Sequence, residues 1–290
     1  MTMSAPQPIF SDHIASANGQ TPLTHVSATD VSLSFGNRIL FDRISFSIDK
    51  GEFVCVLGET GCGKSTLLRL ILGEEQPTTG GLVVSGKKIR GVNRNCGYVP
   101  QKYSLFPDRT VLSNLVFGPE SAALSVLSRF SSKSRERRRE IRQEAFSWLA
   151  RIGLQAADAN KYPHQLSGGM QQRVAIAQAL MMKPSILLMD EAFSALDPNT
   201  RGGMQALIHN LWLQTATTIV FVTHNTHEAA CLASRLFVLA KKNSEASTIV
   251  LDESVPFSRD RFADRRLRSE VLELIHRIES YSRGAFSDAE

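Results

Sequence analysis

The sequence predicts an α/β fold built around a mostly parallel sheet. Short apolar runs typical of strands alternate with segments of helical periodicity, and such alternation favours parallel strands joined by helices. The run Ile186–Met189 is apolar at every position, as expected of a strand that is buried on both faces. With 290 residues, the chain is long enough for one large domain or two small ones.

The composition is that of an ordinary globular protein, with 42% apolar and 21% charged residues. The longest apolar stretches fall far short of the roughly 20 residues of a membrane-spanning helix, and the first residues lack the regions of a secretory signal. The cysteines lie far apart without a CxxC pair, which favours reduced thiols over a zinc site or a disulfide framework (Cys55, Cys62, Cys96 and Cys231).

The net charge of +5 comes from one segment. Between Arg129 and Arg142 there are seven basic and two acidic residues, so the rest of the chain is neutral overall. A nucleic-acid binder carries its positive charge over a broader surface, and we therefore expect no nucleic-acid partner. The segment is interpreted as a solvated helix face, with contact to acidic lipid headgroups or to a loop of a partner protein as the alternative.

The sequence divides into an N-terminal tail, one domain and a C-terminal tail. Residues 1–24 have no period and predict a flexible tail, and residues 25–250 predict a domain. Strands are predicted near residues 31–35 and 44–48 and at Phe53–Leu57, Leu82–Val84, Gly97–Val99, Ile186–Met189, Thr218–Thr223 and Leu236–Leu239. Helices are predicted at Lys64–Leu72 and in a helical subdomain at about 102–165. Residues 251–290 predict a C-terminal tail with an amphipathic helix, whose apolar positions are Leu267, Val271, Leu274 and Ile278.

The strongest local signal is a glycine-rich loop between a predicted strand and a predicted helix. Its residues, Gly58, Glu59, Thr60, Gly61, Cys62, Gly63, Lys64 and Ser65, match the phosphate-loop pattern G-x-x-x-x-G-K-[ST], and Thr66 follows in the first turn of the helix. The loop predicts backbone amides that converge on phosphate oxygens, with Lys64 reaching the β- and γ-phosphates and the Ser65 hydroxyl binding Mg²⁺. A plain glycine turn would leave Lys64 and Ser65 unexplained.

Two acidic residues, Asp190 and Glu191, directly follow the buried strand. The carboxyl edge of an open α/β sheet is where ligands bind. We expect Asp190 to hold Mg²⁺ and Glu191 to orient or deprotonate an attacking water. The alternative, a pair of surface charges, is disfavoured by the phosphate loop in the same chain.

A second glycine-containing segment precedes another predicted helix. Ser167 is a favourable N-cap residue, Gly168 and Gly169 open the helix, and Gln171 lies in its first turn. The apolar stripe of the helix is Val174, Ala177 and Met181. The segment predicts a second helix N-terminus that attracts anions, more than a hundred residues after the first. A Gly-Gly turn that merely caps a helix is the alternative.

In this order, the motifs resemble those of the ATP-binding subunit of ABC transporters, over about Val26–Val250. The run Leu166–Arg173 (LSGGMQQR) is close to the family signature, and it precedes the strand and acids Ile186–Glu191 (ILLMDE) as it does in the family. The resemblance implies an α/β P-loop NTPase (RecA-like) core with a mostly parallel sheet, an antiparallel β subdomain and an inserted α-helical subdomain. It also implies an ATPase that uses ATP and Mg²⁺.

Further positions take roles from the resemblance, one by one. Gln101 matches the Q-loop glutamine that senses Mg²⁺ and the attacking water, Asp197 matches the D-loop, and His224 matches the switch histidine that contacts the γ-phosphate. Phe35 takes the place of the aromatic residue that stacks on adenine, although it could equally be a core residue. Ala192 and Asn225 depart from the usual Pro and Asp without removing a ligand.

The resemblance also implies partners. Two copies of the chain, or one copy and a paralogous ATPase subunit, would hold each ATP between Lys64 and Ser65 of one copy and Ser167 and Gly169 of the other. Integral-membrane permease subunits would bind near the Q-loop, and a solute-binding protein would act indirectly. The expected location is the cytoplasmic face of the cell membrane, as a peripheral subunit.

The run Lys161–Ala177 is similar to the branch that imports nitrate, sulfonate, taurine or bicarbonate. Alternatives within the family are an importer of another small solute, such as urea or guanidine, an exporter, or an ABC ATPase that acts on ribosomes or DNA. A phosphate-loop kinase or regulatory NTPase is the alternative outside the family, and it would leave the signature and His224 without a purpose.

Overall fold

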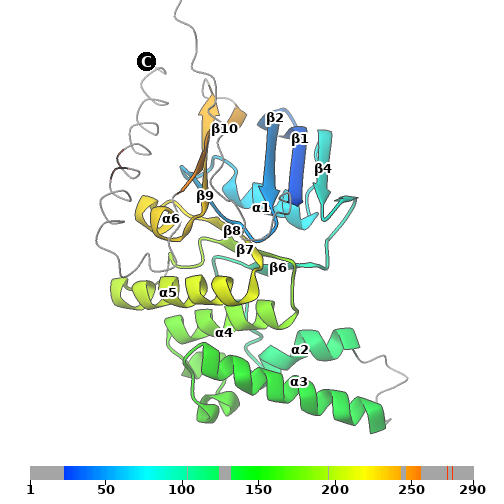
Figure 1. Ribbon diagram of the computed structural model, residues 1–290, viewed down its shortest axis with the longest axis vertical. Coiled ribbons are helices and arrows are strands. Elements are labelled where there is room, and N and C mark those ends of the chain that lie inside the picture. Colours follow the sequence, from blue (N-terminus) through cyan, green and yellow to red (C-terminus); the bar gives the residue numbers. More distant parts are fainter. Residues whose placement is uncertain are drawn as a thin grey trace, which may run out of the picture.

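The computed structural model describes residues 23–102, 104–123, 132–194, 196–242 and 246–255, together with Glu273 and His276. The predicted N-terminal tail, up to residue 22, and the predicted C-terminal amphipathic helix lie outside these residues. One ten-stranded sheet runs through the described part in the order β5-β4-β1-β2-β10-β9-β3-β8-β7-β6 (Figure 1). The predicted α/β class is therefore confirmed.

The parallel part of the sheet has the order β9-β3-β8-β7-β6. Its strands are β3 (Phe53–Gly58), β6 (Cys96–Val99), β7 (Ile186–Asp190), β8 (Thr218–Val222) and β9 (Arg235–Lys242). Every residue of β7 and β8 is buried, because helices cover both faces of the sheet there. Because these strands are parallel, their carboxyl ends meet at one edge.

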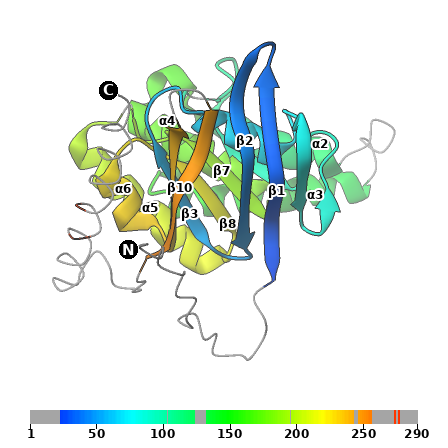
Figure 2. The ribbon, with the colours of Figure 1, turned by 90° about the horizontal axis from the view of Figure 1, so that it is seen from above.

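The other strands are mostly antiparallel. They are β1 (Thr24–Phe35), β2 (Arg38–Asp49), β4 (Thr79–Val84), β5 (Lys87–Lys88) and β10 (Ala246–Ser254). Figure 2 shows β1, β2 and β4 side by side along one flank of the molecule. β10 joins them to the parallel strands, since it pairs with β9 along its length and touches β2 at Ser247 and Phe41. The sequence analysis predicted neither β5 nor β10.

Helix α1 (Lys64–Leu72) follows β3, with the predicted bounds. The predicted helical stretch consists of α2 (Val111–Ala123), α3 (Ser132–Arg151) and two short 3₁₀ turns, Ala156–Asn160 and Pro163–Gln165, all inserted between β6 and β7. α4 (Gly168–Met181), α5 (Pro198–Thr215) and α6 (Thr226–Leu232) complete the helices of the described residues. No helix in the described ranges is both long and apolar enough to span a membrane.

Strand β3 separates two hydrophobic cores, because its side chains alternate between the two faces of the sheet. Val54 and Val56 point toward α1 and the antiparallel strands, whereas Phe53, Cys55 and Leu57 point toward the other helices. Figure 1 shows the same division, with α1 beside β1 and β2 and with α4 and α5 on the opposite side. The loop that leaves β3 is therefore held firmly from both sides.

A buried polar contact joins the first strand to the middle of the sheet. The Nδ1 atom of His25 lies 2.6 Å from the Thr218 hydroxyl, which also accepts the Gly51 amide at 2.9 Å. The Thr218 hydroxyl has one donor hydrogen and two acceptor lone pairs, so it serves both the Gly51 amide and the His25 ring. Burial, and to a lesser degree the charge of Lys50, lowers the pKa of His25.

We expect this contact to make folding stability depend on pH. Below the ordinary histidine pKa of about 6.5, the unfolded chain binds a proton that folded His25 refuses, so stability is lost as the pH falls. The free energy of unfolding should then fall by up to about 1.4 kcal/mol per pH unit. In His25→Gln, the part of this pH dependence of the unfolding free energy that comes from His25 should disappear. Urea unfolding from about pH 8 to about pH 5.5 measures it. Equal slopes in the two proteins would contradict the assignment.

Candidate functional site

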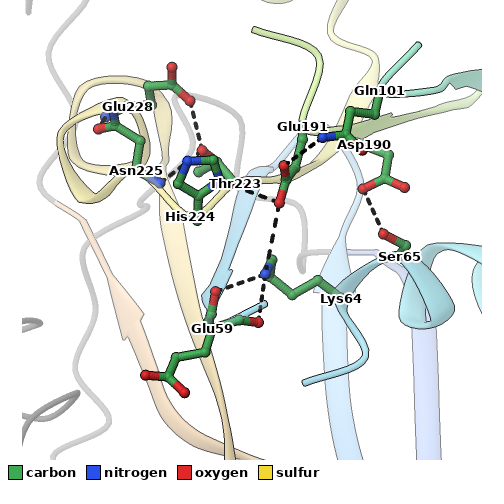
Figure 3. Close-up of polar contacts among 11 residues, drawn as sticks. Glu59, Lys64, Ser65, Gln101, Asp190, Glu191, Thr223, His224, Asn225 and Glu228 are labelled. Carbon is green, nitrogen blue, oxygen red and sulfur yellow. Dashed lines mark hydrogen bonds and ion pairs between the residues drawn. The ribbon is translucent and has the colours of Figure 1, made fainter. Parts of the chain in front are cut away.

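The glycine-rich loop between β3 and α1 curls around the side chain of Lys64. This side chain is buried, and its ammonium donates hydrogen bonds to the carbonyl oxygens of Gly58 and Glu59, both at 2.8 Å (Figure 3). Carbonyl oxygens are neutral partners for a full positive charge. The ammonium is therefore poised to exchange them for a negatively charged oxygen, which binds it more strongly.

Two glycines make this loop conformation possible. Gly58 lies so close to the backbone oxygen of Leu239 on β9 that no Cβ atom would fit. Gly63 has a φ of 98°, and a Cβ atom there would lie 2.8 Å from the ring of Phe41. Both positions therefore exclude side chains. Without side chains there, the backbone amides at the start of α1 are accessible to a phosphate group.

Asp190 lies at the end of β7, beside the start of α1. Its carboxylate accepts a hydrogen bond from the Ser65 hydroxyl at 2.9 Å and another from the Tyr98 hydroxyl at 3.3 Å. Burial, followed by the charge of Asp190, raises the pKa of Tyr98 to about 12. The structure thus places Ser65 and Asp190, two of the three predicted Mg²⁺ ligands, side by side, whereas the third, Gln101, donates to Glu191. It adds Tyr98, which the sequence analysis did not single out.

Glu191 is the point where several segments meet (Figure 3). The Gln101 amide donates to its carboxylate at 3.0 Å, His224 Nδ1 lies 3.4 Å from it, and Lys64 Nζ lies 4.0 Å from it. Its backbone has a φ of 43°, an uncommon value for a residue other than glycine. All four predicted catalytic residues are therefore brought together.

A buried network fixes the loop that carries His224. Glu228, which is 4% exposed, accepts the Thr223 hydroxyl at 2.7 Å and lies 3.4 Å from Arg201, which in turn donates to the Leu196 carbonyl at 3.0 Å. Burial raises the pKa of Glu228, although Thr223 and Arg201 oppose this effect. Asn225, in place of the more usual Asp, caps α6 by accepting the Glu228 amide at 3.1 Å. The sequence analysis missed Thr223, Arg201 and Glu228.

The Ser167 segment lies at the start of α4, as predicted. The Ser167 hydroxyl accepts the Met170 amide at 3.3 Å, and the Gln171 side chain donates to the Leu166 carbonyl at 3.2 Å. Ser167 is exposed, Gly168 is half-buried, and Gly169 is buried against the Thr200 side chain. Asp197, which caps α5, accepts the Thr200 amide at 3.1 Å. In the described part of the chain, the hydrogen bonds of Ser167 stay within its own helix terminus and do not reach the phosphate loop.

A cavity of about 460 Å³ lies beside the first half of the phosphate loop. Its wall is formed by Leu57–Thr60, His224, Thr226 and Val238. Phe35 is not among these residues. It ends β1 and is 49% exposed, so it is not the core residue that the sequence analysis considered as an alternative.

Cys62 lies inside the phosphate loop and is 2% exposed. Burial raises the pKa of its thiol, although the charge of Lys64 opposes this effect, so little thiolate forms at neutral pH. We expect N-ethylmaleimide to label Cys62 slowly at pH 7 and to prevent ATP binding once attached. The measurement is mass spectrometry of the labelled peptide beside an ATP-binding assay, with Cys62→Ser as the control. Normal ATP binding by fully labelled protein would contradict this expectation.

The site and the fold together define a class of protein. A phosphate loop between a strand and a helix, with a carboxylate at the end of a strand in the same parallel sheet, is the arrangement of P-loop nucleoside triphosphatases. Residues 41–194 match the ABC transporter family. The chain belongs to this family, and it is an ATP-binding subunit with ATPase activity.

Individual relatives agree with this assignment. The chain is 34% identical to the aliphatic sulfonates import ATP-binding protein SsuB of Bacillus thuringiensis, over 86% of this chain and 94% of the relative. It is 40% identical to the nitrate import ATP-binding protein NrtC of Synechococcus elongatus, over 83% of this chain but only 34% of that longer protein. It also resembles a dimeric post-hydrolysis ATP-binding cassette bound to ADP and Pi, with 29% identity, a TM-score of 0.65, and coverage of 80% of this chain and all of that one.

Proposed function

We propose that this chain powers the import of a small anion, such as nitrate, a sulfonate, taurine or bicarbonate, by hydrolysing ATP beneath a separate membrane permease. The observation that carries the proposal is the convergence of Gln101, Lys64 and His224 on the carboxylate of Glu191. The names of the sulfonate and nitrate import relatives support the solute class.

In the proposed mechanism, Lys64 and the amides of the phosphate loop bind the β- and γ-phosphates. The Lys64 ammonium exchanges its two carbonyl partners for phosphate oxygens, while the loop keeps its shape through the glycines. Phe35, exposed at the end of β1, offers a ring face to the adenine base.

The residues around Asp190 suit Mg²⁺, because a hydroxyl and a carboxylate oxygen lie 2.9 Å apart at the phosphate end of the loop. Magnesium in nucleotide sites is held by one or two such protein oxygens together with phosphates and waters. Ser65 and Asp190 would hold the ion, with Gln101 near it, and the bound ion neutralises charge on the β- and γ-phosphates.

Glu191 would accept a proton from the attacking water. The water oxygen forms a bond to the γ-phosphorus while the bond to the leaving oxygen of ADP breaks, and the water proton passes to the carboxylate. Gln101 orients the carboxylate through its hydrogen bond, and His224, whose Nδ1 lies 3.4 Å from the same carboxylate, would contact the γ-phosphate. The network of Thr223, Arg201 and Glu228 would position His224.

A second copy of the chain would complete each site. The helix terminus formed by Ser167, Gly168, Gly169 and Gln171 is exposed at Ser167, and its backbone amides and positive end suit a γ-phosphate held by another protomer. Asp197 would lie at the interface, since Thr200 links it to Gly169 in the same protomer. We place this dimer on the cytoplasmic face of the cell membrane, against permease subunits that receive solute from a binding protein.

The proposal is tested by deleting the gene in its own organism and measuring uptake of labelled nitrate, taurine, an alkanesulfonate and bicarbonate. We expect the uptake of one of these anions to be lost, and to be restored by the wild-type gene but not by Glu191→Gln. Unchanged uptake of all four would reject the anion-import proposal.

A further inference from the structure

Charge is sorted by face along helix α3. The exposed arginines Arg135, Arg139 and Arg142, with the half-buried Arg138 between them, recur at the three- and four-residue spacing that places side chains on one helix face. We call these four residues the basic stripe. The acidic residues Glu136, Glu140 and Glu144, each four apart, follow a different face, and the buried residues Ile141, Ala145, Trp148 and Leu149 define a third.

The acidic residues do not neutralise the basic stripe. Glu140 pairs with Arg137 at 2.7 Å, and Glu144 pairs with Lys183 at 2.9 Å, so these carboxylates are used by bases outside the stripe. Among the described residues, Arg135, Arg139 and Arg142 form no ion pair and no hydrogen bond. The stripe is therefore an uncompensated positive surface.

The stripe is exposed and continues into an aromatic side chain. Phe146, one turn beyond Arg142, is 42% exposed. The buried apolar residues of α3 begin at Ile141, and Ser134 is the one buried residue described before it. Figure 1 shows the N-terminal end of the helix reaching beyond α4. A cluster of four basic residues on one exposed helix face is typical of segments that bind anionic lipid headgroups.

We infer that the basic stripe of α3 binds the anionic phospholipid surface of a bilayer. Exposed guanidinium groups bind phosphate groups through paired hydrogen bonds, and the stripe presents three exposed guanidinium groups along one helix face. The cavity described above lies at the phosphate loop, away from the stripe, so the stripe fits an extended anionic surface better than an enclosed ligand. The inference goes beyond the proposed import function and does not depend on it, because lipid binding needs neither ATP nor a permease.

The test is sedimentation of the purified chain with vesicles, either of pure phosphatidylcholine or with about one third phosphatidylglycerol. A triple variant, Arg135→Gln with Arg139→Gln and Arg142→Gln, removes three exposed charges. The matched control, Lys87→Gln with Lys88→Gln and Arg90→Gln, removes three exposed charges from and beside β5. Circular dichroism and ATPase activity should stay unchanged in both variants.

We expect wild type and control to bind only the anionic vesicles, and to be released by about 1 M salt. The stripe variant should partition about a hundredfold more weakly, since each basic residue near an anionic surface contributes about fivefold. Equal binding of wild type and stripe variant, or equal binding to both vesicle types, would overturn the inference. Displacement by millimolar inorganic phosphate would assign the stripe to a free anion instead, and binding only to vesicles that contain the permease would assign it to a protein partner.

Discussion

Glu191→Gln is expected to bind ATP with wild-type affinity and to hydrolyse it at least about a hundredfold more slowly, because the amide cannot accept a proton from water. The substitution keeps the shape of the side chain and its contact with Gln101. The released γ-phosphate would normally open the dimer, so the variant should remain dimeric in ATP. Phosphate release and light scattering measure the two effects.

Glu74→Gln is the matched control for this prediction, because Glu74 is exposed beyond the end of α1 and its only described ion pair is with Arg69. It should hydrolyse ATP at the wild-type rate. A Glu191→Gln protein that stays monomeric in saturating ATP would contradict the proposed sequence of closure and hydrolysis.

Ser167→Arg is expected to bind ATP as a monomer and to lose nearly all hydrolysis. Because Ser167 is exposed, Arg fits there without a clash, and the lost N-cap bond to Met170 lowers stability by only about 1 kcal/mol. The long charged side chain blocks the helix terminus that a second copy would meet. Sedimentation velocity in ATP, together with phosphate release, measures both effects. Full-rate hydrolysis by a monomeric Ser167→Arg protein would contradict the shared site.

A mixing experiment makes this second prediction sharper. Lys64→Ala should be inactive because its own phosphate loop is impaired, yet it keeps an intact Ser167. Mixed with Ser167→Arg, it should form dimers in which one site joins an intact loop to an intact helix terminus. Because a two-fold dimer has two equivalent sites and the mixed dimer has one of them intact, an equal mixture should restore at most about one half of the wild-type activity. Mixing Ser167→Arg with itself should restore none.

The sequence predicted the parts of the site that local chemistry dictates. The phosphate loop, the start of α1 at Lys64 and the N-cap at Ser167 each need particular residue types at fixed spacing, so the pattern specifies them without knowledge of the fold. The buried strand β7 was equally clear, because a strand covered on both faces has no polar positions.

The rest depended on contacts between distant segments. β10 begins almost two hundred residues after β2 ends, and nothing local in Ala246–Ser254 indicates the sheet position between β2 and β9. Glu228 lies in the first turn of a helix, where an acidic residue usually faces water, and only the packing of Arg201 and Thr223 against it reveals a buried carboxylate. The role of Tyr98 is also visible only in the folded structure, because its partner Asp190 lies on the neighbouring strand β7.

The tight fit of Gly169 against Thr200 has a practical consequence for dissecting this protein. A Cβ atom at position 169 would clash with the Thr200 methyl group, so any larger residue there forces the Thr200 side chain to move. A loss of activity in such a variant would reflect altered packing between α4 and α5 as well as a lost dimer contact. Ser167 is exposed and does not pack between the two helices, so a loss of activity there is easier to assign to the dimer contact. Genetic variation at Gly169 should therefore lower the abundance of the protein in the cell more than variation at Ser167, where only the N-cap bond to Met170 is lost.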